Sequence, residues 1–396
     1  GIVAGTTAFK TVTINDGEAL TVTGTVNVDT MNLSSSTGTG TNAVTFKNTT
    51  TIGDLAMGDD DATSTNNITF DTSTQAYTAT IALSNGDSDA SDTNTITIDG
   101  GSIAAAGSAN LLTYASVIHA DDEIDNIVIG SITTAGNALF NAAVTATNIT
   151  LDGGDTADEA SSVEFQGAVT ATAILLDKNT ADSTMTVNAT NGAVTVAGTI
   201  DGVTAGDGIL AVIDDDGVAP DLVTFASQIG GTGIGQLNIG NATNGGAANA
   251  TESEVITAVT IAITGGADAL ADSSLMSSGD GIVATSISLD DNLGSATLII
   301  NTTDGTQAIG GIINAATANE GILTIYDDDG NGIDKATFSG IIGATGRIGA
   351  INLGSATAAG VALFNADVTA GTLTLLGGDA AAEATALTTN STAANS

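Results

Sequence analysis

The chain has 396 residues and a formal net charge of −40, from 45 acidic and five basic residues. Because five basic side chains cannot neutralise a run of phosphates, this composition excludes nucleic-acid binding and disfavours attachment to a bare anionic membrane. The absence of cysteine excludes disulfides and thiolate metal sites. No apolar run approaches the roughly 18 residues that a membrane span needs, so we expect no transmembrane segment.

The chain repeats itself after a divergent N-terminal part. The segment 130–159 matches 354–383 without a gap, and the segment 208–217 recurs as 321–330, at about half that offset. A repeating chain builds length and regular surface. We therefore divide it into a divergent N-terminal β region (1–96), repeat 1 (97–208), repeat 2 (209–321), a partial repeat 3 (322–383) and a tail (384–396).

A shorter period, of about 25 residues, runs inside the long repeat. Four apolar residues recur one period later as Phe165, Val169, Ile174 and Leu176; the first set is Phe140, Val144, Ile149 and Leu151. Within each set the apolar positions fall mostly two or four positions apart, which is the spacing of strands and not of helices. Abundant Thr, Val and Ile, punctuated by Gly, Asn and Asp, agree with strands joined by tight turns.

This pattern predicts an all-β protein, a repetitive right-handed parallel β-solenoid with coils of about 25 residues. The chain length and this period would give roughly 16 coils. Stacking at about 4.8 Å per strand would place Phe140 over Phe165 in an interior aromatic ladder. The alternative architecture is a row of tandem β-sandwich domains, because the long repeat, at roughly 110 residues, is also of ordinary sandwich size.

Clusters of aspartate occur at equivalent places in the long repeat. The segment 327–334, Asp-Asp-Asp-Gly-Asn-Gly-Ile-Asp, resembles the first half of a calcium-binding loop, in which alternate oxygens converge and a glycine permits the bend. The copy at 214–221 keeps the acidic residues, although the alternative for both is a solvated turn. We predict calcium as a cofactor, with ligands Asp327, Asp329, Asn331 and Asp334 in one loop and Asp214, Asp216 and Asp221 in the other.

The sequence does not indicate an enzyme. The single histidine, His119, lies near Asp121 and Asp122, and a lone histidine next to acidic residues is usually a surface side chain. No acidic pair lies in an aromatic-rich stretch of the kind that lines sugar clefts, so we expect neither catalytic residues nor a bound organic cofactor.

The segments 138–146 and 163–171 resemble the passenger repeats of large bacterial surface antigens, of the rickettsial outer-membrane surface protein type, and related surface-layer proteins. This resemblance implies a secreted, surface-displayed β-helical protein. We expect an extracellular structural protein that self-assembles into a cell-surface layer or filament, stabilised by calcium at acidic turns. Its partner would be itself, and candidate further partners are a cell-surface polysaccharide or lipopolysaccharide. The alternative is a monomeric adhesin or autotransporter-type passenger that binds a host or carbohydrate ligand.

Overall fold

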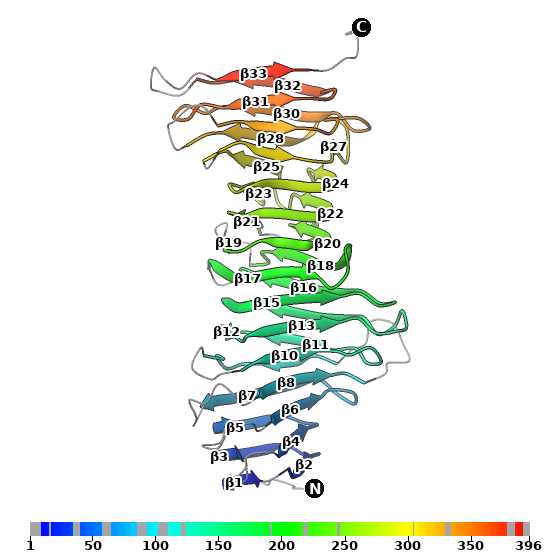
Figure 1. Cartoon of the computed structure of the whole chain (residues 1–396), viewed down its shortest axis with the longest axis vertical. Helices are drawn as coiled ribbons and strands as arrows, with labels where there is room; N and C mark the ends of the chain where they lie inside the picture. Colours follow the sequence, from blue (N-terminus) through cyan, green and yellow to red (C-terminus); the bar gives the residue numbers. More distant parts are fainter. Residues whose placement is uncertain are drawn as a thin grey trace. The chain divides into compact units, whose positions relative to one another are not determined.

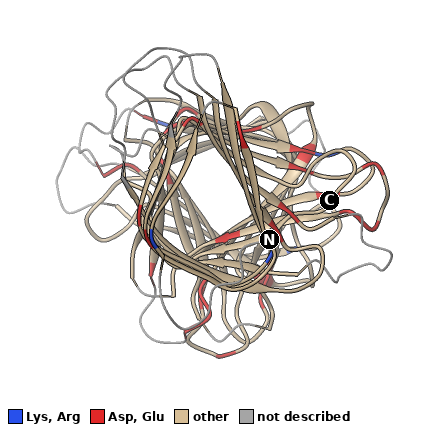
Figure 2. Cartoon of the chain, turned by 90° about the horizontal axis from the view of Figure 1, so that it is seen from below, with Lys and Arg blue, Asp and Glu red and all other residues tan. Residues whose placement is uncertain are grey.

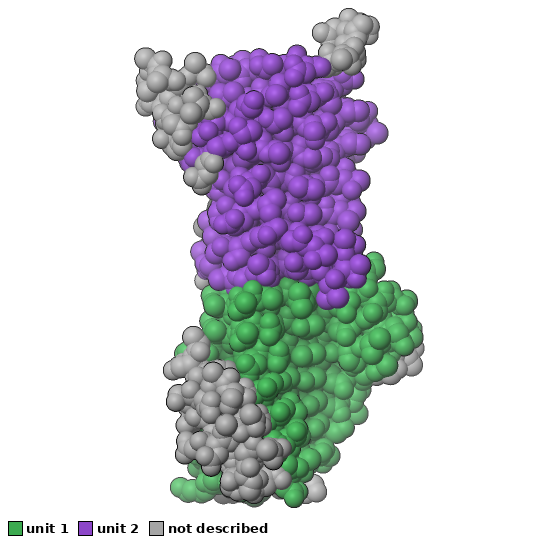
Figure 3. Space-filling model, viewed as in Figure 1, with its two compact units in different colours: residues 1–186 green, residues 187–396 purple. Residues whose placement is uncertain are grey.

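The computed structural model describes residues 9–15, 17–34, 40–57, 65–84, 93–101, 110–119, 124–190, 192–216, 221–243, 246–303, 305–328, 334–377 and 385–390. The described part of the chain contains strands and turns and no helix. It divides into two compact units, unit 1 (Gly1–Thr186) and unit 2 (Val187–Ser396), shown in Figure 3. In each unit parallel strands stack coil upon coil, which confirms the predicted β-solenoid (Figure 1).

The described residues of unit 1 form fifteen strands and most of a sixteenth. They are β1 (Phe9–Asn15), β2 (Ala19–Val22), β3 (Val26–Ser34), β4 (Thr41–Phe46), β5 (Thr50–Met57), β6 (Thr65–Asp71), β7 (Tyr77–Ser84), β8 (Thr93–Asp99), β9 (Leu112–Tyr114), β10 (Asn126–Ile129), β11 (Asn137–Phe140), β12 (Val144–Thr145), β13 (Asn148–Asp152), β14 (Ser161–Phe165), β15 (Val169–Asp177) and β16 (Ser183–Asn188).

In unit 2, the part of the chain that the structure describes forms seventeen further strands. They are β17 (Val194–Gly202), β18 (Asp207–Ile213), β19 (Leu222–Phe225), β20 (Ile229–Ile239), β21 (Asn249–Glu252), β22 (Val255–Thr264), β23 (Ser273–Ser277), β24 (Gly281–Asp290), β25 (Ala296–Asn301), β26 (Gln307–Ile309), β27 (Ile312–Ala315), β28 (Glu320–Tyr326), β29 (Ala336–Phe338), β30 (Ile348–Leu353), β31 (Val361–Phe364), β32 (Ala370–Leu375) and β33 (Ala386–Thr389).

The core is a column of apolar side chains that point into the coils. Along a strand, buried and partly exposed residues alternate, as expected when one face of a sheet is covered. Phe140 pairs with Phe165 in register, and their rings stack 5.3 Å apart between centroids. Tyr114 extends the stack below Phe140 at 5.6 Å. The predicted interior aromatic ladder is therefore confirmed in unit 1, and in-register stacking is what the short period encodes.

The coils are fewer than the roughly 16 expected from the chain length and the short period, because loops lengthen many of them. The two units together hold about 13 turns. In unit 1 the separation along the chain between successive rungs is short where Ile14 pairs with Leu33, and much longer where Ile96 pairs with Ile127. Extra residues leave the strands in register because they are accommodated in the loops between strands.

Three strand columns run through unit 2. Column a contains β18, the C-terminal halves of β20, β22 and β24, and β27. Column b contains β19, β21, β23, β25, β28, β30 and β32. Column c contains the N-terminal halves of β22 and β24, then β26, β29, β31 and β33. Each turn therefore has three faces.

The long repeat is not a whole number of turns. Leu210 lies in column a, where successive pairings through Leu237, Ile261 and Ile287 lead four turns on to Ile313. Its sequence equivalent, Leu323, lies beyond Ile313 on the next strand, in column b. The repeat therefore spans four turns and one further strand column. Copies of the same motif consequently lie in different columns.

Two glycines of the long repeat are explained by close backbone contact. Gly130 has φ +79°, and a Cβ there would lie 2.6 Å from the carbonyl oxygen of Asp152. Gly354, its equivalent, has φ +74°, and a Cβ would lie 2.0 Å from the carbonyl oxygen of Leu376. Only glycine combines the left-handed conformation with room for the neighbouring coil.

Candidate functional site

The predicted ligand Asp214 follows β18 and is buried, with 1% of its surface exposed. Its Oδ1 accepts a hydrogen bond of 3.3 Å from the backbone N–H of Asp216, and the N–H of Asp221 also donates to this carboxylate. The carboxylate of Asp214 therefore binds backbone N–H groups from both ends of the loop that follows β18. Asp216 and Asp221 contribute backbone donors here, which is a role that the sequence pattern did not indicate.

The second predicted loop also begins with a buried aspartate that directly follows a strand. Asp327 follows β28, is 1% exposed, and its backbone N–H donates to the carbonyl oxygen of Ala359 at 2.7 Å. Asp334 lies beyond the loop, before β29. The predicted ligands Asp329 and Asn331 lie outside the described residues.

The charges around Asp214 are unfavourable for a bare carboxylate. Burial raises its pKa, and the nearby carboxylate of Asp216 raises it further, against the lowering effect of the donated N–H groups. No basic side chain among the described residues pairs with it. Acidic residues occur on strands and loops around the coils, with few basic residues among them (Figure 2). The basic residues Lys47 and Lys178 pair with Asp71 and Asp182, both in unit 1.

Carboxylates alone do not form a metal site in the part of the chain that the structure describes. No group of three or more carboxylate, imidazole or thiol side chains is arranged there to hold a metal ion. Any cation held by these loops would therefore need amide, hydroxyl or carbonyl oxygens as well. Such ligands are normal for calcium, which takes about 6–8 oxygens of mixed kind.

Buried amides supply such oxygens, and the sequence analysis did not identify them. Asn301 ends β25 and is 5% exposed; its Nδ2 donates to Oδ2 of Asp328 at 3.0 Å, and its Oδ1 has no hydrogen-bond partner. Gln307 lies close by, with Nε2 bonded to the carbonyl oxygen of Asn301 at 2.6 Å. The offset of the long repeat could have found Asn301, because Asn188 occupies the equivalent place.

An isolated carboxylate lies in the interior of unit 2. Glu252 is fully buried in column b, in register with Phe225 below and Ser277 above. Its Oε1 accepts the N–H of Glu254 at 2.7 Å, while its Oε2 has no partner. Burial, together with the charges of Glu254 and Asp280, raises the pKa of Glu252 to about 7.

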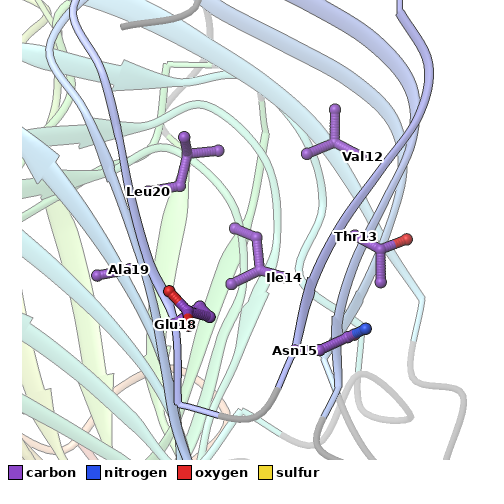
Figure 4. A pocket seen from close by; sticks show the side chains of 7 residues that line it. All are labelled: Val12, Thr13, Ile14, Asn15, Glu18, Ala19 and Leu20. Carbon is purple, nitrogen blue, oxygen red and sulfur yellow. The ribbon is translucent and has the colours of Figure 1, made fainter.

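The first coil of unit 1 leaves its interior partly uncovered. Val12, Ile14 and Leu20 line a hollow between β1 and β2, bordered by Asn15 and Glu18 (Figure 4). Val12 is half-buried, whereas its register partner in β3, Met31, is 1% exposed. The apolar core thus reaches the surface at this end of the unit.

The last coils of unit 2 show the same property more strongly. Leu373 and Leu375 of β32 are each 49% exposed, although their partners in β30, Ile351 and Leu353, are buried. Leu376 beside them is 44% exposed. These leucines occupy interior positions of the column, and no further coil among the described residues lies above them. The predicted tail contributes β33, which pairs with β31 and places Thr389 beside Phe364.

The chain matches no protein-family model, no curated protein and no solved structure. No helix among the described residues has the length and apolar character that crossing a membrane requires.

Proposed function

We propose that this chain is an extracellular structural protein that self-assembles into a cell-surface layer or filament. The observation that carries the proposal is the uncovered apolar interior at the first coil of unit 1 and at the last coils of unit 2. Each of these ends also has a strand, β1 or β32, with one ladder edge free of a described partner strand. Such an edge is a template for a further parallel strand.

A second copy of the chain is the occupant that fits both ends. The edge strands are parallel to those beneath them, so docking β32 of one copy beside β1 of the next would continue the ladder in the same direction. Completing the burial of Leu373 and Leu375 would contribute about 1 kcal/mol for each side chain. Contact between two different surfaces is head-to-tail, and it produces an extended assembly wherever the rotation from copy to copy does not close a ring.

The acidic composition is consistent with assembly in the presence of calcium. With 45 acidic and five basic residues, neighbouring copies repel one another unless cations intervene. Calcium at the loops after β18 and β28 would reduce this repulsion.

Electron microscopy of the purified protein, with calcium and after chelation, tests the proposal. We expect ordered filaments or sheets with calcium. The variant Leu373→Asp should stay as single particles, because it places a charge on the docking surface. The matched control is Leu270→Asp, at a position 91% exposed on the loop between β22 and β23, which should assemble normally. Single particles of the wild-type protein under every condition would contradict assembly and favour the adhesin.

A further inference from the structure

One side of unit 2 exposes a large apolar side chain on each of four successive coils. Val259 of β22 and Val283 of β24 are 45% and 56% exposed. Ile312 of β27 and Ile341, which follows β29, are each 39% exposed. We define these four residues as the apolar stripe. A single exposed apolar residue needs no explanation, whereas a row of them on neighbouring coils marks an interaction surface.

The strand register places the stripe at the edge where column c leads into column a. Thr257 pairs with Val283, so the two valines of the stripe are one coil and two positions apart. The next coil continues the surface, because β24 pairs with β27. The N–H of Ile313 donates to the carbonyl oxygen of Ile341 at 3.0 Å, which places the two isoleucines of the stripe on adjacent coils. The stripe is therefore continuous along the stack of coils.

The segments that carry the stripe have no charged side chain. These segments are 255–264, 281–289, 305–319 and 336–346. The uncharged surface ends one coil beyond Ile341, where the N–H of Ile342 donates to the carbonyl oxygen of Asp367 at 2.9 Å. Because the chain has a net charge of −40, a like-charged molecule meets less repulsion at this surface than at the acidic loops.

Glycines beside the stripe leave gaps between its side chains. Gly310 lies next to Val283 on the following coil, and a Cβ there would come no closer than 3.5 Å to any neighbouring atom. A side chain would fit at this position and none is present. At Gly340 a Cβ would lie 1.7 Å from the carbonyl oxygen of Gly311, so the two coils meet there backbone to backbone. The surface thus alternates protruding apolar side chains with gaps.

We infer that the apolar stripe is a lateral contact between two copies of this chain. The stripe of a second copy is equally uncharged, whereas a basic partner would be drawn to the acidic loops. A second copy also has the same spacing of one coil per strand, about 4.8 Å, so side chains of one stripe can enter the gaps of the other along all four coils. Because both copies use the same surface, the contact is isologous and joins copies in pairs.

The small size of the stripe indicates how the contact works. Stable complexes bury about 800 Å² on each partner, which is more than four partly exposed side chains supply. The contact between two isolated copies is therefore weak. It becomes effective where end-to-end docking presents many stripes in a row, because linked contacts reinforce one another. The inference rests on the proposed function for these rows, and it adds that filaments associate side by side in pairs.

Electron microscopy of variants under the assembly conditions tests the pairing of filaments. We expect the wild type to form paired filaments and Val283→Asp to form single ones, because the variant places a charge in the lateral contact and leaves both ends unchanged. Val283 is exposed, so its variant retains the fold. The matched control is Leu293→Asp, at a position 68% exposed on the loop between β24 and β25, which should form pairs. Paired filaments of Val283→Asp would overturn the inference.

Sedimentation equilibrium of Leu373→Asp tests the contact without end-to-end docking. We expect a weak dimer, strengthened when salt rises from about 0.05 M to about 0.5 M, because screening reduces the repulsion between copies. Adding Val283→Asp should weaken the dimer by about tenfold or more, since the contact would bury an unpaired charge. Adding Leu293→Asp should leave its dissociation constant within about twofold of the parent value.

The two measurements distinguish this inference from the proposed function. A Leu373→Asp protein that stays monomeric at every salt concentration would overturn the lateral contact, and so would equal dimerisation of the two double variants. If the wild type never forms filaments, yet Leu373→Asp dimerises and Val283→Asp abolishes the dimer, the proposed function fails and the lateral contact stands.

Discussion

The two units treat buried polar side chains in opposite ways. In unit 1 three buried asparagines stack in register: Asn42 Nδ2 donates to Asn66 Oδ1, and Asn66 Nδ2 donates to Asn94 Oδ1, each at 3.0 Å. In unit 2 several buried polar atoms have no partner: Asp214 Oδ2, Glu252 Oε2, Ser273 Oγ, Ser277 Oγ, Asn301 Oδ1 and Gln307 Oε1. The corresponding described atom in unit 1 is Ser183 Oγ.

The difference depends on whether a side chain can hydrogen-bond to an identical side chain on the next rung. An amide carries both a donor and an acceptor, so identical amides on successive rungs satisfy one another. A carboxylate only accepts, and its neighbours in unit 2 differ from rung to rung: Phe225, Glu252, Ser277 and Ile300 follow one another in column b. In a parallel in-register solenoid, a polar interior is therefore stable where the rung residue repeats and the side chain can pair with itself.

Removing a ring from the repeated ladder should have the largest effect. Phe140→Ala deletes a side chain stacked between Tyr114 and Phe165, and we expect the free energy of unfolding to fall by about 3–5 kcal/mol. Urea unfolding followed by circular dichroism measures the loss. The control Phe9→Ala, at a position 38% exposed in β1, should change it by less than about 1 kcal/mol. Equal losses in the two variants would show that the ladder is not the core of unit 1.

The unrepeated interior of unit 2 should be sensitive to pH. The pKa of Glu252 is about 7 in the folded chain, against an ordinary value of 4.5. Below pH 4.5 both states hold the proton, so the residue contributes no difference. As the pH rises from 4.5 to about 7 the unfolded state releases its proton first, and stability falls. Above pH 7 the native state bears the full cost, about 3 kcal/mol as an upper value.

The variant Glu252→Gln removes this pH dependence. It keeps an acceptor for the N–H of Glu254 and carries no charge. We expect it to be more stable than the wild type by up to about 3 kcal/mol near pH 8 and equally stable near pH 4. Thermal unfolding across this range checks the result. The control is Asp268→Asn, which removes a charge at an exposed site on the loop between β22 and β23. If the wild type and Glu252→Gln keep a constant difference at all pH values, the buried carboxylate is not the cause.

The sequence predicted what depends on periodicity. The spacing of Phe140 and Phe165 predicts the strands, their register and the buried positions together. This is because strands that stack in parallel and in register place equivalent residues over one another. It did not predict the face on which a motif lies, since Leu210 and Leu323 share a sequence context but occupy different columns. That outcome depends on the summed lengths of the loops within four turns, which no local pattern encodes.

The candidate site was only partly predictable for a related reason. Asp214 and Asp327 stand out because they belong to acidic runs. In the structure both are buried, directly after β18 and β28. Asn301 does not stand out, because the chain is rich in asparagine and this residue acts on Asp328, one coil later in the sequence. The asparagine ladder of unit 1 was missed similarly: the spacing from Asn42 to Asn66 differs from that between Asn66 and Asn94, so no single period aligns them.

The smallest expected effect tests the paired ladder of unit 1 directly. Asn66→Ala removes both bonds of the central amide and leaves Nδ2 of Asn42 and Oδ1 of Asn94 buried without their partner, which should cost about 2 kcal/mol. The matched control is Asn67→Ala, one position along β6 on its outer face, which should change stability by less than about 0.5 kcal/mol. Hydrogen exchange should show faster opening of β4, β6 and β8 in the first variant alone. If Asn66→Ala does not change the free energy of unfolding, interior water replaces the amide without loss. The hydrogen bonds of the asparagine ladder would then not explain the contrast between the units.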